Sequence, residues 1–255
     1  TISYTSQGSG DVVLMLHGFM ESKEIWTDFA KILSLDYRVI CIDLPGFGGS
    51  SVFSDTHSME FMADMVKKVL QYEDISNFYV VGHSMGGYVA MALSEKYGNN
   101  IRGMVMFHSQ AAADTTDAKT NRNRAIEFIK ENKSTYISSF VPLLFAEENV
   151  PLYKDEILEL QKTCSLTSSE GIIAALAGMR DRKDYRMQLI ENSFPVLFIL
   201  GKQDSRILID DILPQLILSA NTEANILDKT GHMGFIEQKE KTMKTLLYFF
   251  KKHSN

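Results

Sequence analysis

Short apolar runs, each followed by a loop rich in glycine, histidine or aspartate, constrain the fold of this chain more than any other feature. Because these runs are apolar throughout, they predict strands buried on both faces of a parallel sheet. Amphipathic helical stretches separate them, so their order predicts a doubly wound α/β fold. Ligands of such sheets bind beyond the carboxyl ends of the strands, where the glycine clusters lie. The runs are Asp11–Leu16, Tyr37–Ile42, Phe78–Val81, Met104–Phe107, Val196–Leu200 and Ala224–Leu227.

The middle of the chain has a different pattern. No glycine occurs from Met104 to Glu170, and residues 111–192 contain amphipathic segments without a convincing strand. We therefore predict a helical cap at 111–192, inserted between core segments 1–110 and 193–255. Thr167 and Glu170 have the spacing of a capping box, which predicts a helix start. Helices are predicted at Trp26–Leu33, Met59–Tyr72, Met85–Tyr97 and Lys239–Lys252 in the core, and at Asn123–Glu131, Leu152–Lys162 and Ser169–Met179 in the cap.

Charge and cysteine usage exclude several classes of protein. The 255 residues include 26 Lys and Arg against 32 Asp and Glu, a net charge of −6, which argues against a nucleic-acid surface. No apolar run reaches the roughly 18 residues of a membrane span, and no signal segment is evident. Cys41 and Cys164 are too few for a disulfide framework, so we expect buried thiols in a cytoplasmic protein. A monomer or homodimer is expected.

A glycine-rich turn follows the third apolar run. Gly82-His83-Ser84-Met85-Gly86 lies between a predicted strand and a predicted helix. That context is typical of a G-x-S-x-G nucleophile elbow, in which a sharp turn exposes the serine near a helix N-terminus. Residues two before and two after the serine crowd each other, so only small ones fit. A simple Gly-rich turn with an exposed serine is the alternative, but the context favours Ser84 as a nucleophile.

A serine nucleophile needs a base and an acid, and this architecture orders them as nucleophile, acid, histidine. Of the six histidines, His232 and His253 come late enough in the chain, and His253 lies in a charged tail. We therefore predict His232 as the base. Asp204, in a loop after a strand, is the predicted acid. Its competitors suit less well, because two look like a helix start and one is too near His232; they are Asp210, Asp211 and Asp228.

Two backbone N–H groups are predicted to form an oxyanion hole. Met85 follows the nucleophile, and Phe19 lies in the loop after the first central strand. Gly18 lets the backbone approach the site closely. His17 is expected to be a structural histidine behind this hole.

These motifs resemble those of the α/β-hydrolase superfamily, in the family's order and across essentially the whole chain. The resemblance implies an α/β-hydrolase fold with a mostly parallel eight-stranded sheet, flanking helices, and a helical cap inserted after strand six. It implies no metal and no organic cofactor. The motifs are the His17-Gly18-Phe19 loop, Asp43–Ser50, the Gly82–Gly87 elbow, Gly201-x-x-Asp204 and Gly231-His232.

Within the superfamily the chain is similar to capped carboxylesterases, enol-lactonases and carbon–carbon bond hydrolases. We predict a serine hydrolase that cleaves a small or medium carboxylic ester through an acyl-enzyme on Ser84. An enol-lactonase or carbon–carbon bond hydrolase is an alternative, favoured if Arg124 or Arg180 contacts an acidic substrate. A ligand-sensing homologue with slow turnover is an alternative of another class. Apolar residues predicted to bind substrate, although such residues are also typical of a core, are Met20, Phe140, Leu144, Met179 and Met233.

Overall fold

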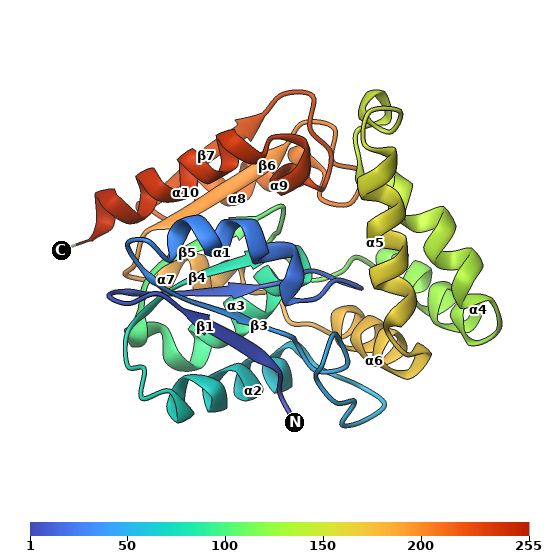
Figure 1. Cartoon of the computed structure of the whole chain (residues 1–255), viewed down its shortest axis with the longest axis horizontal. Coiled ribbons are helices and arrows are strands. Elements are labelled where there is room, and N and C mark those ends of the chain that lie inside the picture. Colours follow the sequence, from blue (N-terminus) through green and yellow to red (C-terminus); the bar gives the residue numbers. More distant parts are fainter. Residues whose placement is uncertain (255) are drawn as a thin grey trace.

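A single mixed sheet runs through the centre of the computed structural model, which describes residues 1–254 (Figure 1). Its seven strands lie in the order β1-β3-β2-β4-β5-β6-β7. β1 pairs antiparallel with β3, and the other neighbouring strands pair parallel. The strands are β1 (Tyr4–Gln7), β2 (Val12–Leu16), β3 (Arg38–Ile42), β4 (Phe78–His83), β5 (Ile101–Phe107), β6 (Val196–Gly201) and β7 (Thr222–Leu227).

The strand count is one lower than the eight that the family resemblance implied. Each of the six apolar runs forms a strand, and β1 adds a seventh at the antiparallel edge. Within residues 1–254 no further strand joins this sheet. β1 escaped prediction because its sequence, YTSQ, is largely exposed and polar. The helical insertion therefore follows the fifth strand and not the sixth.

Helices cover both faces of the sheet. Figure 1 shows α1 and α10 on one side and α2 and α3 on the other. α2 and α3 have the predicted bounds, and the Ser58 hydroxyl caps α2 by accepting a hydrogen bond from Phe61 N (3.1 Å). The helices outside the predicted cap are α1 (Thr27–Leu33), α2 (Met59–Tyr72), α3 (Met85–Tyr97), α8 (Ile209–Leu216), α9 (Gly234–Glu237) and α10 (Lys239–His253), with 3-10 turns η1 (Lys23–Trp26) and η2 (Gly98–Asn100). α7 (Arg186–Glu191) lies within the predicted cap at 111–192 but contacts α3.

Residues 116–180, between β5 and β6, are mainly helical and gather at one end of the sheet (Figure 1). The 25-residue α4 changes direction at Asn132, whose backbone is non-helical (φ −129°, ψ 36°). α6 is capped by Ser168, one residue after the predicted Thr167. The division into core and cap domains remains a prediction. The segment contains α4 (Thr116–Phe140), η3 (Val141–Leu144), η4 (Glu147–Asn149), α5 (Lys154–Leu166) and α6 (Ser169–Arg180).

Both cysteines are buried and unpaired. Burial raises the pKa of the Cys41 and Cys164 thiols to about 12, so neither is a thiolate near neutral pH. Among the described residues, no helix combines the length and apolar character needed to cross a bilayer.

Candidate active site

Ser84 lies at a strained turn between β4 and α3. Its φ of 50° and ψ of −113° are unusual for a residue with a side chain. The turn has no room for side chains on either side of it. A Cβ on Gly82 would lie 2.4 Å from the Gly86 carbonyl oxygen, and one on Gly86 would lie 2.5 Å from the Leu16 oxygen. The crowding expected of a nucleophile elbow is therefore present here.

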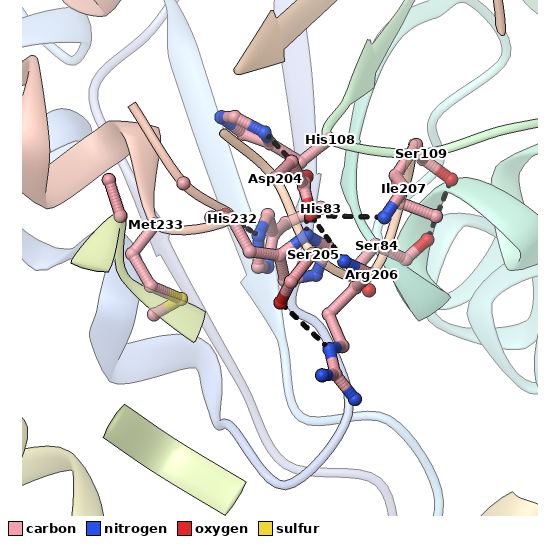
Figure 2. A network of polar contacts seen from close by, with 12 residues as sticks. His83, Ser84, His108, Ser109, Asp204, Ser205, Arg206, Ile207, His232 and Met233 are labelled. Atoms are coloured by element: carbon pink, nitrogen blue, oxygen red, sulfur yellow. Dashed lines mark hydrogen bonds and ion pairs between the residues drawn. The ribbon is translucent and has the colours of Figure 1, made fainter. Parts of the chain in front are cut away.

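The Asp204 carboxylate, in the loop after β6, accepts four hydrogen bonds (Figure 2). Oδ2 accepts from Nδ1 of His232 (2.8 Å) and Nδ1 of His108 (3.0 Å). Oδ1 accepts from the backbone N–H groups of Arg206 (2.8 Å) and Ile207 (3.0 Å). Burial alone would raise the pKa of Asp204, but the charge of His232 and the hydrogen bonds hold this pKa well below its usual range. Asp204 is thus ionised and fixed in direction.

His232, in the loop between β7 and α9, is held through its backbone as well as its ring. Its N–H donates to the Leu144 carbonyl (2.6 Å), and its own carbonyl accepts from Nε2 of His83 (3.0 Å). Ser84 and His232 line the same cavity. Across residues 1–254, no hydrogen bond joins the Ser84 hydroxyl to His232. Such bonds often shorten only when substrate binds. The fold thus brings Asp204 and His232 into contact and places His232 and Ser84 on one cavity.

A second buried ion pair, Glu21 with His83, was not predicted from the sequence. His83 Nδ1 donates to Glu21 Oε2 (2.9 Å), which also accepts from Gly18 N (2.5 Å). Because both ring nitrogens of His83 face acceptors, the ring is an imidazolium. Burial would lower the pKa of His83, but the Glu21 charge outweighs burial and raises it. Burial likewise opposes ionisation of Glu21, whose pKa the His83 charge nevertheless lowers. The pair joins the loops of Gly18, Ser84 and His232.

His108 is a further site histidine that the sequence did not reveal. It follows β5 with a φ of 47°, is fully buried, and donates from Nδ1 to Asp204. Burial lowers its pKa to about 4, so the ring is neutral near pH 7, and Nε2 has no partner. Among residues 1–254, His108, Asp204 and His232 form the one trio that could offer three metal ligands. Both rings direct Nδ1 to one carboxylate oxygen, which is an arrangement of N–H donors.

The two predicted oxyanion donors lie beside Ser84 in sequence or line its cavity. Met85 is the first residue of α3, and Phe19 follows β2. Among the turn and loop hydrogen bonds of residues 1–254, neither N–H is a donor, and the role of both as oxyanion donors stays a prediction. His17 donates from Nδ1 to the Gly18 carbonyl (2.7 Å) and accepts at Nε2 from Leu44 N (2.9 Å). Burial lowers the pKa of His17, which therefore has a structural, neutral role.

The cavity above Ser84 has a volume of about 440 Å³ and lies between the strand-end loops and helices α4 and α6. Three residues predicted to bind substrate, Phe140, Leu144 and Met179, line it, and substrate binding by them stays a prediction. Met20 and Met233 do not line it, because both are fully buried in the core, and Figure 2 shows Met233 pointing away from the polar network. A larger cavity of about 500 Å³, between α1 and α5, contains none of the predicted site residues.

The basic residues of this cavity are Arg122 and Arg206, which the sequence did not single out. Arg124 and Arg180, considered from sequence, do not line it. Arg180 pairs instead with Asp181. Residues two apart on a helix point in different directions, so only the fold could tell that Arg122, and not Arg124, faces the cavity.

The sequence and the fold of this chain also match those of known proteins. The family model described as alpha/beta hydrolase fold matches residues 11–239. The chain belongs to the α/β-hydrolase family. This α/β-hydrolase is 27% identical over 266 residues to the monoacylglycerol lipase ABHD6 of Bos taurus, covering 93% of this chain and 74% of the relative.

Solved structures give the same result. A thermophilic esterase from Thermogutta terrifontis, with malate bound, superposes with a TM-score of 0.95 at 27% identity, covering 100% of this chain and 94% of that one. An enol-lactonase from Burkholderia xenovorans LB400 has a TM-score of 0.90 at 17% identity, covering 98% of this chain and 96% of that one; this likeness concerns the fold alone. The chain is thus a hydrolase of the α/β-hydrolase family.

Proposed function

We propose that this α/β-hydrolase cleaves small or medium carboxylic esters through an acyl-enzyme on Ser84. The observation that supports this most is the 2.8 Å bond from His232 Nδ1 to the buried, ionised Asp204, because His232 lines the same cavity as Ser84. That bond fixes the imidazole so that its other nitrogen is the base. The lipase and esterase relatives support the ester as the bond that is cleaved.

The proposed mechanism has two acyl-transfer steps. Ser84 Oγ attacks the ester carbonyl while His232 Nε2 takes its proton, and the N–H groups of Phe19 and Met85 stabilise the oxyanion. When the C–O bond to the alcohol breaks, His232 returns the proton to the leaving oxygen. Water then attacks the acyl-enzyme with His232 again as base, which releases the acid and restores Ser84.

The cavity wall supports an apolar acyl group of limited size. Phe140, Leu144, Leu176 and Met179 contribute apolar surface, and about 440 Å³ fits a small or medium ester. Enol-lactone hydrolysis is the second candidate, because the same groups would open a lactone and the cavity contains two arginines. No metal or organic cofactor takes part in this mechanism.

We also propose a cap over the active site and a cytoplasmic location for the protein. Residues 111–192 would act as a cap over core segments 1–110 and 193–255, since α4 and α6 contribute to the cavity wall. The buried, unpaired thiols of Cys41 and Cys164 support a reducing, cytoplasmic setting. Light scattering would distinguish a monomer from a homodimer.

The test of the function is hydrolysis of p-nitrophenyl butyrate by the wild type and the Ser84→Ala variant. We expect kcat to fall on the order of 10⁴-fold or more, because the variant lacks the nucleophile. Mass spectrometry should detect a butyryl adduct on wild-type Ser84 after rapid quenching. Ser139→Ala, an exposed serine on α4, is the matched control and should keep full activity. Near-wild-type activity of Ser84→Ala overturns the proposal, and a single slow turnover of the wild type favours the sensor alternative.

A further inference from the structure

The cavity above Ser84 contains two guanidinium groups, although acidic residues outnumber basic ones in the chain as a whole. Arg122 comes from α4, and Arg206 comes from the loop that also supplies Asp204. The two differ in what neutralises them. That difference indicates where a substrate charge would bind.

Arg122 already has a partner. Its guanidinium donates to the Asp114 carboxylate, and Nη1 lies 3.5 Å from the Met179 sulfur. Arg182 donates to the same carboxylate (2.5 Å) and to the Ala112 carbonyl (3.0 Å). One carboxylate therefore serves two guanidinium groups, so Arg122 adds only part of a positive charge to the cavity wall.

Arg206 has no such partner. In residues 1–254, none of the ion pairs includes Arg206, and its side chain donates only from Nε to Ser205 Oγ (3.2 Å). Its guanidinium carbon lies 5.5 Å from the ring centre of Phe140. Figure 2 shows the guanidinium extending beyond Ser205, with its terminal nitrogens free of drawn contacts. Because its backbone N–H donates to Asp204 (2.8 Å), this loop position is fixed beside the site.

The acidic group in the cavity lining does not neutralise Arg206. Glu21 is 4% exposed, and its Oε2 already accepts hydrogen bonds from His83 Nδ1 and Gly18 N. An ionised Glu21 beside an imidazolium leaves little net charge on that side. The Asp204 carboxylate does not pair with this guanidinium either, because its oxygens accept from His108, His232 and two backbone N–H groups. The Arg206 guanidinium therefore has no carboxylate partner and lies next to the apolar surface of Phe140.

We infer that Arg206, with Arg122 contributing to the field, binds a carboxylate at the end of one arm of the ester. This inference rests on the proposed ester hydrolysis and names its preferred substrate class, the monoesters of small dicarboxylic acids. A guanidinium presents parallel N–H donors that match both oxygens of a carboxylate. One fully unpaired cation balances one negative charge, which suits a carboxylate better than a phosphate dianion. Phe140 would pack against the methylene chain between the carboxylate and the ester.

The kinetic test compares two nearly isosteric esters, the p-nitrophenyl monoester of glutaric acid and p-nitrophenyl hexanoate. We expect kcat/KM of the wild type to be about 10-fold or more higher for the glutarate ester. Arg206→Gln should lower the glutarate-to-hexanoate ratio of kcat/KM by about 10- to 100-fold. Arg206→Lys should lower this ratio by less, because lysine keeps the positive charge but lacks the parallel N–H donors of the guanidinium. Arg180→Gln, outside the cavity, should leave the ratio unchanged. An unchanged ratio in Arg206→Gln overturns the inference even when hexanoate hydrolysis is normal.

A binding measurement separates this inference from the proposed function. Calorimetry with monomethyl glutarate and Ser84→Ala, which needs no turnover, should show binding that Arg206→Gln weakens about 10-fold or more. If the wild type has no esterase activity but binding of monomethyl glutarate still depends on Arg206, the carboxylate site is supported and only the ester chemistry is overturned. Equal binding with and without Arg206, or stronger competition by inorganic phosphate than by glutarate, overturns the carboxylate assignment.

Discussion

The two sides of the cavity above Ser84 are held in different ways. The strand-end side, formed by the loops after β2, β4, β6 and β7, is fixed by buried charged groups whose hydrogen bonds join one loop to another. The helical side, formed by α4, η3 and α6, presents Phe140, Leu144 and Met179 together with the partly buried Arg122 side chain. One side is a network of directed bonds, whereas the other is a packed surface.

This difference separates reaction from specificity. Hydrogen bonds have direction, so the strand-end network can orient Asp204 and His232 within narrow limits. Apolar packing has little direction, so the helical side can vary in shape while the network stays intact. Changes to the buried network of the strand-end side should therefore reduce turnover of every substrate. Changes on the helical side, or to the exposed Arg206 side chain, should alter the choice among substrates.

The largest expected effect on the strand-end side follows replacement of Asp204 by Asn. We expect kcat for p-nitrophenyl butyrate to fall about 10⁴-fold with little change in KM, since an amide favours the wrong imidazole tautomer. Steady-state kinetics checks this result. Asp228→Asn, an exposed aspartate that pairs with Lys202, is the control and should keep its activity. A loss below about tenfold in Asp204→Asn would show that the site does not depend on this carboxylate.

Glu21→Gln should give the next largest effect, because it breaks the buried pair that joins three loops. We expect kcat to fall about 10- to 100-fold through misplacement of the Gly18 and His232 loops. Loss of one partner of a buried pair should also lower the free energy of unfolding by about 3 kcal/mol. Urea denaturation and steady-state kinetics measure the two quantities. Glu24→Gln, an exposed residue nearby, is the matched control. Equal kinetics for the two variants would contradict a positioning role for Glu21.

His108 predicts a pH dependence of stability on the same side of the cavity. Its pKa is about 4 in the folded protein, against 6.5 for an unperturbed histidine, so between these limits the unfolded chain binds more protons. The neutral ring makes its full contribution to the free energy of unfolding above pH 6.5. That contribution falls by about 3 kcal/mol as the pH decreases from 6.5 toward 4. We therefore expect the stability difference between wild type and His108→Gln to shrink from about pH 7.5 to about pH 4.5 in urea denaturation. If the free energy of unfolding of wild type and of His108→Gln changed with pH in parallel, the low pKa of His108 would be contradicted.

The smallest effect is expected from Arg124→Gln on the outer side of α4. Arg124 hydrogen bonds to Asn121 (3.3 Å) and does not line the cavity. We expect less than about a twofold change in kcat/KM for both the glutarate and the hexanoate ester, as for other surface substitutions. A selective loss with the glutarate ester would show that the substrate extends farther over α4 than the cavity does.

Several features could be predicted from the sequence because their causes are local. Apolar runs fix which segments are buried strands, and α2 and α3 have the bounds that their periodicity predicts. The sterics of Gly82 and Gly86 identify the elbow around Ser84. Chain order singled out Asp204 and His232, which the fold joins by a hydrogen bond. Their catalytic roles stay predictions for the variants above to test.

Other features depend on contacts between distant residues, which no local pattern encodes. Glu21 and His83 are 62 positions apart, and His108 and Asp204 are 96 apart. The strand count, the burial of both predicted pocket methionines and the identity of the cavity arginines likewise depended on packing. The sequence alone determined the fold class and the candidate nucleophile, acid and base, because hydrophobic period and turn sterics act within a few residues. Only the tertiary structure decided which charges remain unpaired in the cavity, because pairing depends on distances across the fold.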